Sequence, residues 1–275
     1  MIKIGVRAHD FGKLSPDELF ARIADAGFDC VQLAFPKAIA GVNSFEEVTP
    51  EIVKAVDKAA AANNIEIAVV GCYQDLATTN ATDAAYAIKR TINMMNVAKD
   101  LGAYTVASES SAVLIPEAER DEACERVANV IGRILKKARE LDMRYSLEPV
   151  FYHAVTNKER FFRVLRQVGA ENFHLIYDPT NMMDPQYLET QEQYMNMCLD
   201  CFSPYIGVIH YKDFTVDSEG KYHPCRLGDG RLSPTPVKNY LKHLGYKGCY
   251  LIREELEPQN AAYEVEYLKK LAGRA

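Results

Sequence analysis

The 275-residue sequence lacks any apolar run that approaches the roughly 18–20 residues needed to cross a bilayer. Its opening, MIKIGVRAHD, lacks the basic stretch, the long apolar core and the cleavage site of a signal peptide. We therefore expect a cytoplasmic protein with no membrane partner. Low-complexity segments and Pro/Gly-rich linkers are also missing, which predicts a single domain over residues 1–275.

The sequence also has no excess of basic residues, as its formal net charge of −6 shows. Since nucleic-acid phosphates are met by lysine and arginine, we expect no nucleic-acid partner. The seven cysteines are an odd number, which favours buried thiols over a disulfide framework. Cys198 and Cys201 form a C-x-x-C, but it lies in a helical stretch without two further zinc ligands, so we expect a structural role.

What the sequence does contain is a regular alternation of short apolar runs with longer amphipathic stretches. The apolar runs span residues 2–6, 30–35, 65–71, 104–108, 144–150, 173–178, 205–210 and 249–254. The amphipathic stretches span residues 15–27, 49–64, 83–102, 117–142, 157–169, 190–202, 235–245 and 260–273. Short and continuously apolar runs are typical of parallel strands that are buried on both faces.

Eight strand–helix units predict a (β/α)8 TIM barrel, since eight such units close more naturally than they form an open sheet. The alternative is a doubly wound open sheet, which would carry a glycine-rich phosphate loop after its first strand. Here the first strand is followed by RAHDFGKLS, which is no such loop.

Polar residues stand at the ends of four consecutive strands, where the active site of such a barrel lies. They are Glu148, Asp178, His210 and either Glu254 or Glu255. Alone, each carboxylate could cap a helix or form an ion pair, and the histidine could be a hydrogen-bonded core residue. Together the carboxylates would repel one another, and a divalent cation is the simplest way to hold them. Oxygen-rich ligation with one histidine predicts one ion, Mn²⁺ first, with Mg²⁺, Co²⁺ or Zn²⁺ as alternatives.

The C-terminal half resembles the xylose-isomerase-like superfamily of sugar-phosphate isomerases and epimerases, which includes ketose 3-epimerases and inosose dehydratases. The motifs that carry the resemblance are LEP at 147–149, YDPTNM at 177–182, IHYKD at 209–213, RLGDGRL at 226–232 and GYKGCYLIREE at 245–255. It implies that Glu148, Asp178, His210 and Glu254 bind one metal. It also implies that Glu148 and Glu254 are the catalytic pair, which moves a proton beside a metal-bound carbonyl through an enediolate.

The ligand from the last strand is ambiguous in the sequence. An ungapped alignment from Gly248 places Arg253 close to the position of the family glutamate. Because adjacent strand residues face opposite ways, only one of Glu254 and Glu255 can point inward. We favour Glu254.

Further residues at the same rim are candidates for substrate binding. They are Glu109 after the fourth strand, His153 and Asn181 in the next two loops, and Arg226 after the seventh strand. Glu109 could equally cap a helix, Asn181 could shape its turn, and Arg226 could form a surface ion pair. Some epimerases have a second glutamate where this sequence has Ala154. We also expect Lys212 and Asp213 to pair and to orient His210, Cys72 and Tyr73 to form a pocket wall, and Arg7 and His9 to face one side of the first strand.

The function predicted is a metal-dependent sugar isomerase or epimerase with a small carbohydrate substrate. A metal-dependent dehydratase of an inosose or similar polyol is the alternative. An endonuclease IV-like phosphodiesterase would need three metals and more than the six histidines present. A non-catalytic binding barrel is the remaining alternative, which the metal-ligand set disfavours. The resemblance also suggests a homo-oligomer.

Overall fold

Eight parallel strands close into a barrel in the computed structural model, which describes residues 2–244 and 248–274. The order around the barrel is β1-β10-β7-β6-β5-β4-β3-β2, and β1 pairs with both β10 and β2. This closure confirms the predicted TIM barrel and excludes the open sheet. The strands are β1 (Lys3–Arg7), β2 (Cys30–Leu33), β3 (Glu66–Gly71), β4 (Thr105–Glu109), β5 (Arg144–Glu148), β6 (Phe173–Tyr177), β7 (Ile206–Tyr211) and β10 (Tyr250–Arg253).

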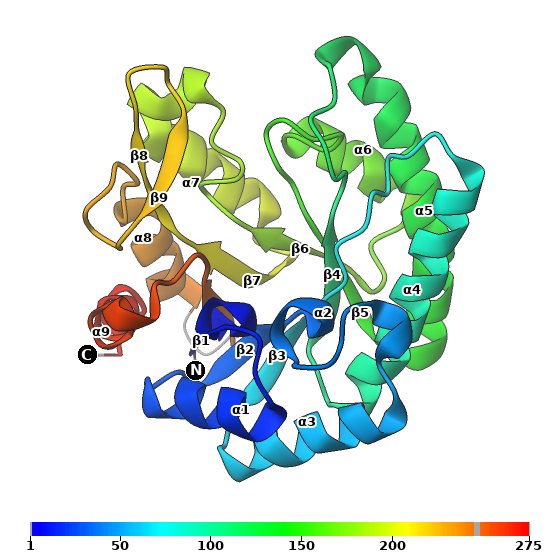
Figure 1. Ribbon diagram of the computed structural model, residues 1–275. Helices are drawn as coiled ribbons and strands as arrows, with labels where there is room; N and C mark the ends of the chain where they lie inside the picture. The colour runs from blue at the N-terminus through cyan, green and yellow to red at the C-terminus, as the bar shows by residue number, and fades with distance from the viewer. Residues whose placement is uncertain (1, 245–247, 275) are drawn as a thin grey trace.

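Helices surround the barrel and alternate with its strands (Figure 1). They are α1 (Pro16–Asp25), α2 (Phe35–Ala38), α3 (Pro50–Ala62), α4 (Ala81–Asp100), α5 (Arg120–Leu141), α6 (Lys158–Val168), α7 (Gln191–Phe202), α8 (Thr235–Leu244) and α9 (Ala261–Leu271). Residues 245–247 lie outside the described residues. They include the expected end of the helix at 235–245 and the start of the 245–255 motif. No helix in the described ranges is long and apolar enough to cross a membrane.

Side-chain caps set where several helices begin. Ser15 accepts a hydrogen bond from the Glu18 amide, and Thr49 accepts one from the Ile52 amide. Asn80 caps α4, which therefore begins at Ala81, two residues before the predicted start. The helix expected from residue 117 begins at Arg120, because residues 117–119 form a separate 3-10 turn.

The barrel interior is filled by small and branched apolar side chains from several strands. This inner cluster consists of Cys30, Ala68, Val69, Ala107, Ile176, Val208 and Ile252. Gly5 belongs to the same close packing, since a Cβ there would lie 2.4 Å from Ile252 Cδ1. A filled interior leaves the carboxyl ends of the strands as the place for a site.

An antiparallel hairpin that the sequence analysis treated as loop follows the seventh strand. It consists of β8 (Asp213–Val216) and β9 (Tyr222–Cys225), and it stands apart from the barrel sheet (Figure 1). The Asp213 carboxylate fastens its base, because it accepts hydrogen bonds from the amides of Phe214, Gly228, Gly230 and Leu232.

All seven cysteines are unpaired, as the sequence analysis expected. Cys198 lies buried in α7, and Cys201 lies in the same helix. The C-x-x-C pair is therefore part of a helix and forms no disulfide.

Candidate metal centre

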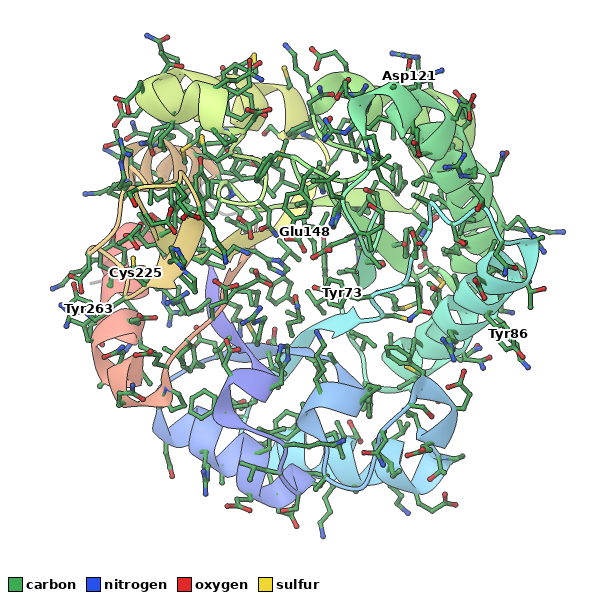
Figure 2. The ribbon with its side chains drawn as sticks, turned by 45° about the horizontal axis from the view of Figure 1, so that its top comes forward. Tyr73, Tyr86, Asp121, Glu148, Cys225 and Tyr263 are labelled. Atoms are coloured by element: carbon green, nitrogen blue, oxygen red, sulfur yellow. The ribbon has the colours of Figure 1, made fainter. Side chains whose placement is uncertain are left out.

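Four predicted side chains meet at the carboxyl ends of β5, β6, β7 and β10. Glu148 is the last residue of β5, Asp178 directly follows β6, His210 is next to last in β7, and Glu254 directly follows β10. Each offers a ligand atom, and these atoms all lie within 4.8 Å of one another. We call these four residues the rim cluster. Figure 2 shows Glu148 near the middle of the ring of helices.

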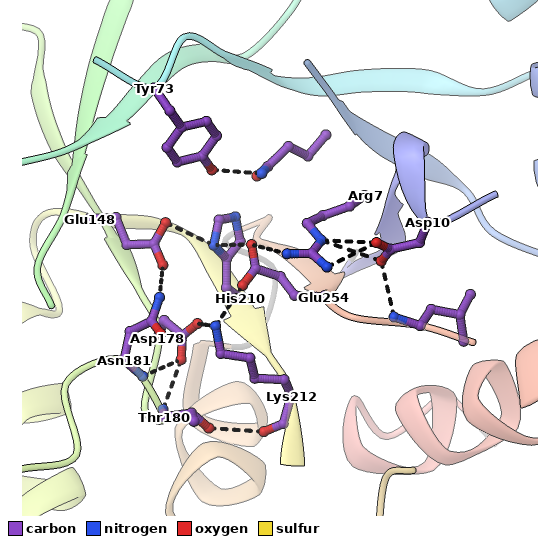
Figure 3. A network of polar contacts seen from close by, with 12 residues as sticks. Arg7, Asp10, Tyr73, Glu148, Asp178, Thr180, Asn181, His210, Lys212 and Glu254 are labelled. Atoms are coloured by element: carbon purple, nitrogen blue, oxygen red, sulfur yellow. Dashed lines mark hydrogen bonds and ion pairs between the residues drawn. The ribbon is translucent and has the colours of Figure 1, made fainter. Parts of the chain in front are cut away.

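Each of the four residues is buried, with at most 4% of its surface exposed. His210 Nδ1 lies 3.1 Å from Glu148 Oε2 and 3.2 Å from Glu254 Oε1 (Figure 3). Neither ring nitrogen of His210 makes an aligned hydrogen bond with the described residues, and neither does Asp178 Oδ2. Buried polar atoms that make no aligned hydrogen bond are costly unless another group satisfies them. The rim cluster therefore suits a divalent metal ion.

Neighbouring side chains fix the carboxylates in place. Asp178 Oδ1 accepts hydrogen bonds from the amides of Thr180 and Asn181, each at 2.8 Å. Asn181 Nδ2 donates to Glu148 Oε1 at 2.7 Å. Asn181 therefore holds two members of the cluster. Its backbone amide binds Asp178, and its side-chain amide binds Glu148.

Lys212 lies inside the rim cluster and does not pair with Asp213, so this expectation was wrong. Its Nζ lies 3.0 Å from Asp178 Oδ2 and 2.9 Å from Glu254 Oε2. Lys212 directly follows β7, and its contacts with Asp178 and Glu254 show that it points inward like His210, while the Asp213 carboxylate binds backbone amides at the base of the hairpin. The carboxylates around the ammonium group outweigh its burial and raise the pKa of Lys212 well above its ordinary value.

Mutual charge effects shift the other groups in the cluster. Burial opposes the charged form of His210, but Glu254 and Glu148 outweigh it and raise the pKa of His210 to about 9. Burial raises the pKa of Asp178 to about 6, although Lys212 opposes this. His210, Lys212 and Arg7 overcome burial to lower the pKa of Glu254. Glu254 is therefore held as a carboxylate.

The backbone at the end of β10 explains which glutamate points inward. Arg253 turns outward to α9, where it is buried and forms an ion pair with Glu264. Glu254 then belongs to the rim cluster, as favoured from the sequence. Glu255 has a φ of 60°, the left-handed region that non-glycine residues seldom adopt. This turn directs Glu255 into the wall of an adjacent pocket.

Glu109 and His153 form a second polar pair beside the cluster. Glu109 is paired in register with Glu148, and its Oε2 lies 3.6 Å from His153 Nδ1. Burial, together with Glu148 and Glu254, raises the pKa of Glu109 to about 8. Burial lowers the pKa of His153 to about 4, so this imidazole is neutral at pH 7.

Arg226 is not brought to the rim cluster by the described contacts. It lies exposed after β9, where its guanidinium forms an ion pair with Asp229 at 2.9 Å and stacks over Tyr263. The surface ion pair considered in the sequence analysis is therefore what the structure shows. To bind the substrate, the Arg226 guanidinium would have to break its contacts with Asp229 and Tyr263.

Three side chains on the β1–β3 side complete the surroundings. The Tyr73 ring faces the cluster (Figure 3), and its hydroxyl accepts a hydrogen bond from Gln32 Nε2 at 2.6 Å. Arg7 Nη1 lies 4.0 Å from Glu254 Oε1. Both Cys72 and Tyr73 were expected to form a pocket wall. Cys72 does not, because it is fully buried and its thiol contacts the Thr91 hydroxyl in α4. Gln32 was missed, although it is a polar residue in an otherwise apolar strand.

Comparison with known proteins identifies one family and several solved structures with a similar fold. A family model described as the xylose isomerase-like TIM barrel matches residues 20–271. No curated protein matches the sequence.

Solved structures match over nearly the whole chain. A D-psicose 3-epimerase determined in the presence of D-fructose has a TM-score of 0.77 at 16% identity, over 99% of this chain and 100% of that one. The 3-keto-D-glucoside 4-epimerase from E. coli has a TM-score of 0.76 at 14% identity, over 98% and 100%. The IOLI protein with a bound zinc atom has a TM-score of 0.73 at 15% identity, over 99% of both chains. At these identities the likeness shows the fold.

Proposed function

Because the chain belongs to the xylose isomerase-like TIM barrel family, we propose that it is a metal-dependent isomerase or epimerase of a sugar or sugar derivative. The observation that carries the proposal is the buried rim cluster, whose three carboxylates and one imidazole converge where such barrels place their chemistry. The names of two structural neighbours, a ketose 3-epimerase and a keto-glucoside epimerase, support a carbohydrate substrate.

Glu148, Asp178, His210 and Glu254 would hold the metal. A divalent ion there would act as a Lewis acid that polarises a substrate carbonyl and acidifies the adjacent C–H bond. We favour Mn²⁺ because three of the four donors are carboxylates, and Mg²⁺, Co²⁺ and Zn²⁺ satisfy the same donors.

Glu148 and Glu254 are the proposed acid–base pair, since they approach the His210 ring from two different strands. His210, Lys212 and Arg7 lower the pKa of Glu254 and hold it as the carboxylate, which is the form that a general base requires. Asn181 holds Glu148 in a fixed orientation for the return of a proton. Return to the same carbon from the other side gives epimerisation, and return to the neighbouring carbon gives isomerisation.

Glu109 and His153 are proposed substrate contacts. With its raised pKa, Glu109 carries a proton at pH 7 and can donate a hydrogen bond to a substrate oxygen. His153 is buried and neutral beside it, so the pair can bind hydroxyl groups without adding charge to the carboxylate-rich site.

Deuterium uptake from D₂O tests the proposed function. The metal-loaded protein is incubated with a panel of free ketoses, glucosylated ketoses and inososes, and carbon-bound deuterium is detected by mass spectrometry and NMR. We expect label on a carbon beside a carbonyl, and loss of labelling by about 10²-fold or more in Glu254→Gln. Glu257→Gln, which changes an exposed glutamate three positions further on, is the matched control and should label at the wild-type rate. Absence of label in every compound would refute the proposal.

A further inference from the structure

A pocket of about 410 Å³ opens beside the rim cluster, under the β8–β9 hairpin. This hairpin pocket is lined by Phe151, Tyr152, Phe214, Tyr222 and two prolines, and by polar groups that include Lys212 and Asn181. Its volume is within the range of pockets that bind small molecules.

Two residues that line the hairpin pocket also contact the rim cluster. Lys212 lines the pocket and also reaches Asp178 and Glu254. Asn181 lines it as well and donates to Glu148. A molecule held at the rim cluster therefore has the hairpin pocket directly beside it.

Aromatic side chains give the pocket flat apolar walls. Tyr222 stacks on Phe214, with ring centroids 4.4 Å apart and an angle of 13° between the planes. Phe151 lies 6.3 Å from the Tyr222 ring, and Tyr152 packs edge-on against Phe151 at 5.0 Å. Such faces pack against the C–H face of a sugar ring, while the ring hydroxyls point sideways to polar groups.

The charges of the lining disfavour a phosphate in this pocket. Lys212 and Lys221 are matched there by Asp213 and Glu255, so no surplus positive charge remains. Lys212 is moreover paired with two carboxylates of the rim cluster. An uncharged, hydroxyl-bearing group fits this lining better than an anion does.

The pocket is built on a fixed support. Asp213 accepts four backbone hydrogen bonds at the base of the hairpin, and Asp217 Oδ1 accepts two more in its turn, from Glu219 and Lys221. On the opposite side, the left-handed backbone of Glu255 turns its side chain into the lining. A strained residue beside a candidate site is consistent with a selected geometry.

We propose that the substrate is a glycoside, in which a second sugar ring attached to the reacting sugar lies in the hairpin pocket against the aromatic wall that Tyr222 and Phe151 form. This inference rests on the proposed function, since it assumes that the reacting sugar lies at the rim cluster. The second ring places the substrate by stacking, and the rim cluster carries out the chemistry.

The inference is tested by comparing the binding of a free ketose with that of its glucosylated forms, in wild type and in Tyr222 variants. Calorimetric binding is measured for D-fructose and for its glucosylated forms isomaltulose and turanose, on the metal-loaded protein. We expect at least one glucosylated ketose to bind about tenfold more tightly than fructose. Tyr222→Ala should remove this preference and leave fructose binding unchanged.

Tyr222→Phe is the matched variant for the stacking role. The Tyr222 hydroxyl is buried with no hydrogen-bond partner among the described residues, so phenylalanine keeps the ring and removes no bond. It should keep the preference, as should Tyr86→Ala, which removes an exposed ring on α4. If Tyr222→Ala does not fold, Tyr152→Ala replaces it, since Tyr152 is 38% exposed on its loop.

The outcomes separate this inference from the proposed function. A preference lost in Tyr222→Ala, without deuterium uptake in any compound, supports the pocket and refutes the isomerase. Deuterium uptake in free ketoses, with equal binding of fructose and its glucosylated forms, supports the isomerase and overturns the glycoside. An equal loss of fructose and glycoside binding in Tyr222→Ala also overturns it.

Discussion

Lys212 brings an ammonium group within 3.0 Å of two carboxylates of the rim cluster. In the metal-free chain it compensates part of their charge. Replacement by methionine leaves Asp178 and Glu254 without this partner in a buried position, which costs about 3 kcal/mol of unfolding free energy. We therefore predict that Lys212→Met lowers the stability of the metal-free protein by this amount.

Chemical denaturation with EDTA and with Mn²⁺ measures the effect. Bound metal supplies the missing positive charge, so the loss should be smaller with Mn²⁺ than with EDTA. Lys221→Met is the matched control, because Lys221 lies at the exposed hairpin turn. Equal losses with and without metal would contradict a shared role of Lys212 and the ion.

The raised pKa of His210 predicts how pH affects the site. Its protonated form stabilises the metal-free fold fully below the ordinary pKa of 6.5, and this contribution is lost as pH rises through about 9. Metal binding requires the neutral imidazole and so must displace this proton near pH 7.5. Calorimetry in buffers of different ionisation enthalpy should show proton release, with affinity that rises towards pH 9. Binding without proton release would be inconsistent with His210 as a ligand.

At the residue scale, the sequence predicted which polar groups gather, since Glu148, Asp178 and His210 interrupt apolar strands at the same end. It did not predict the place of Lys212, because the side chain reaches across to other strands. For Arg226 the sequence left a substrate contact and a surface ion pair open, and the structure shows the ion pair with Asp229. Its loop position depends on the hairpin, which turns it towards Asp229.

At the element scale, the eight barrel strands and their helices follow from apolar runs and capping residues. The β8–β9 hairpin was missed because its strands are four residues each and are not continuously apolar. A signal was present in the turn-forming run Asp217-Ser-Glu-Gly-Lys between two alternating segments. The anchoring role of Asp213 depends on distant amides, which no local pattern reveals.

Two glycine substitutions test the hairpin anchor. A Cβ on Gly230 would lie 2.1 Å from Asp213 Oδ1 and 2.6 Å from the Phe214 carbonyl. We predict that Gly230→Ala lowers the unfolding free energy by about 2 kcal/mol through overpacking. Gly132→Ala, in helix α5 with no atom nearer than 3.9 Å, should instead raise it by about 0.5–1 kcal/mol. Thermal and urea unfolding of both variants measures the contrast, and a neutral Gly230→Ala would show that the anchor tolerates movement.

At the scale of the whole molecule, closure of the barrel turns four separate strand ends into one site. Glu148 and Glu254 are 106 positions apart in a count from 148 to 254, yet both lie 3.1–3.2 Å from the same His210 nitrogen. The number of strand–helix units was enough to predict this closure. The hairpin pocket could not be predicted, because it forms between two loops whose paths are set by tertiary contacts. A single domain over residues 1–275 and a homo-oligomer stay predictions.

The measurement that tests the central claim most directly is the metal content of the purified protein after reconstitution and gel filtration. Wild type is compared with Glu148→Gln, Glu254→Gln and the matched control Glu255→Gln by elemental analysis. The account predicts about one divalent ion per chain in wild type and in Glu255→Gln, with marked loss in the other two variants. A wild type without metal, or Glu148→Gln and Glu254→Gln variants that retain it fully, would contradict the metal centre.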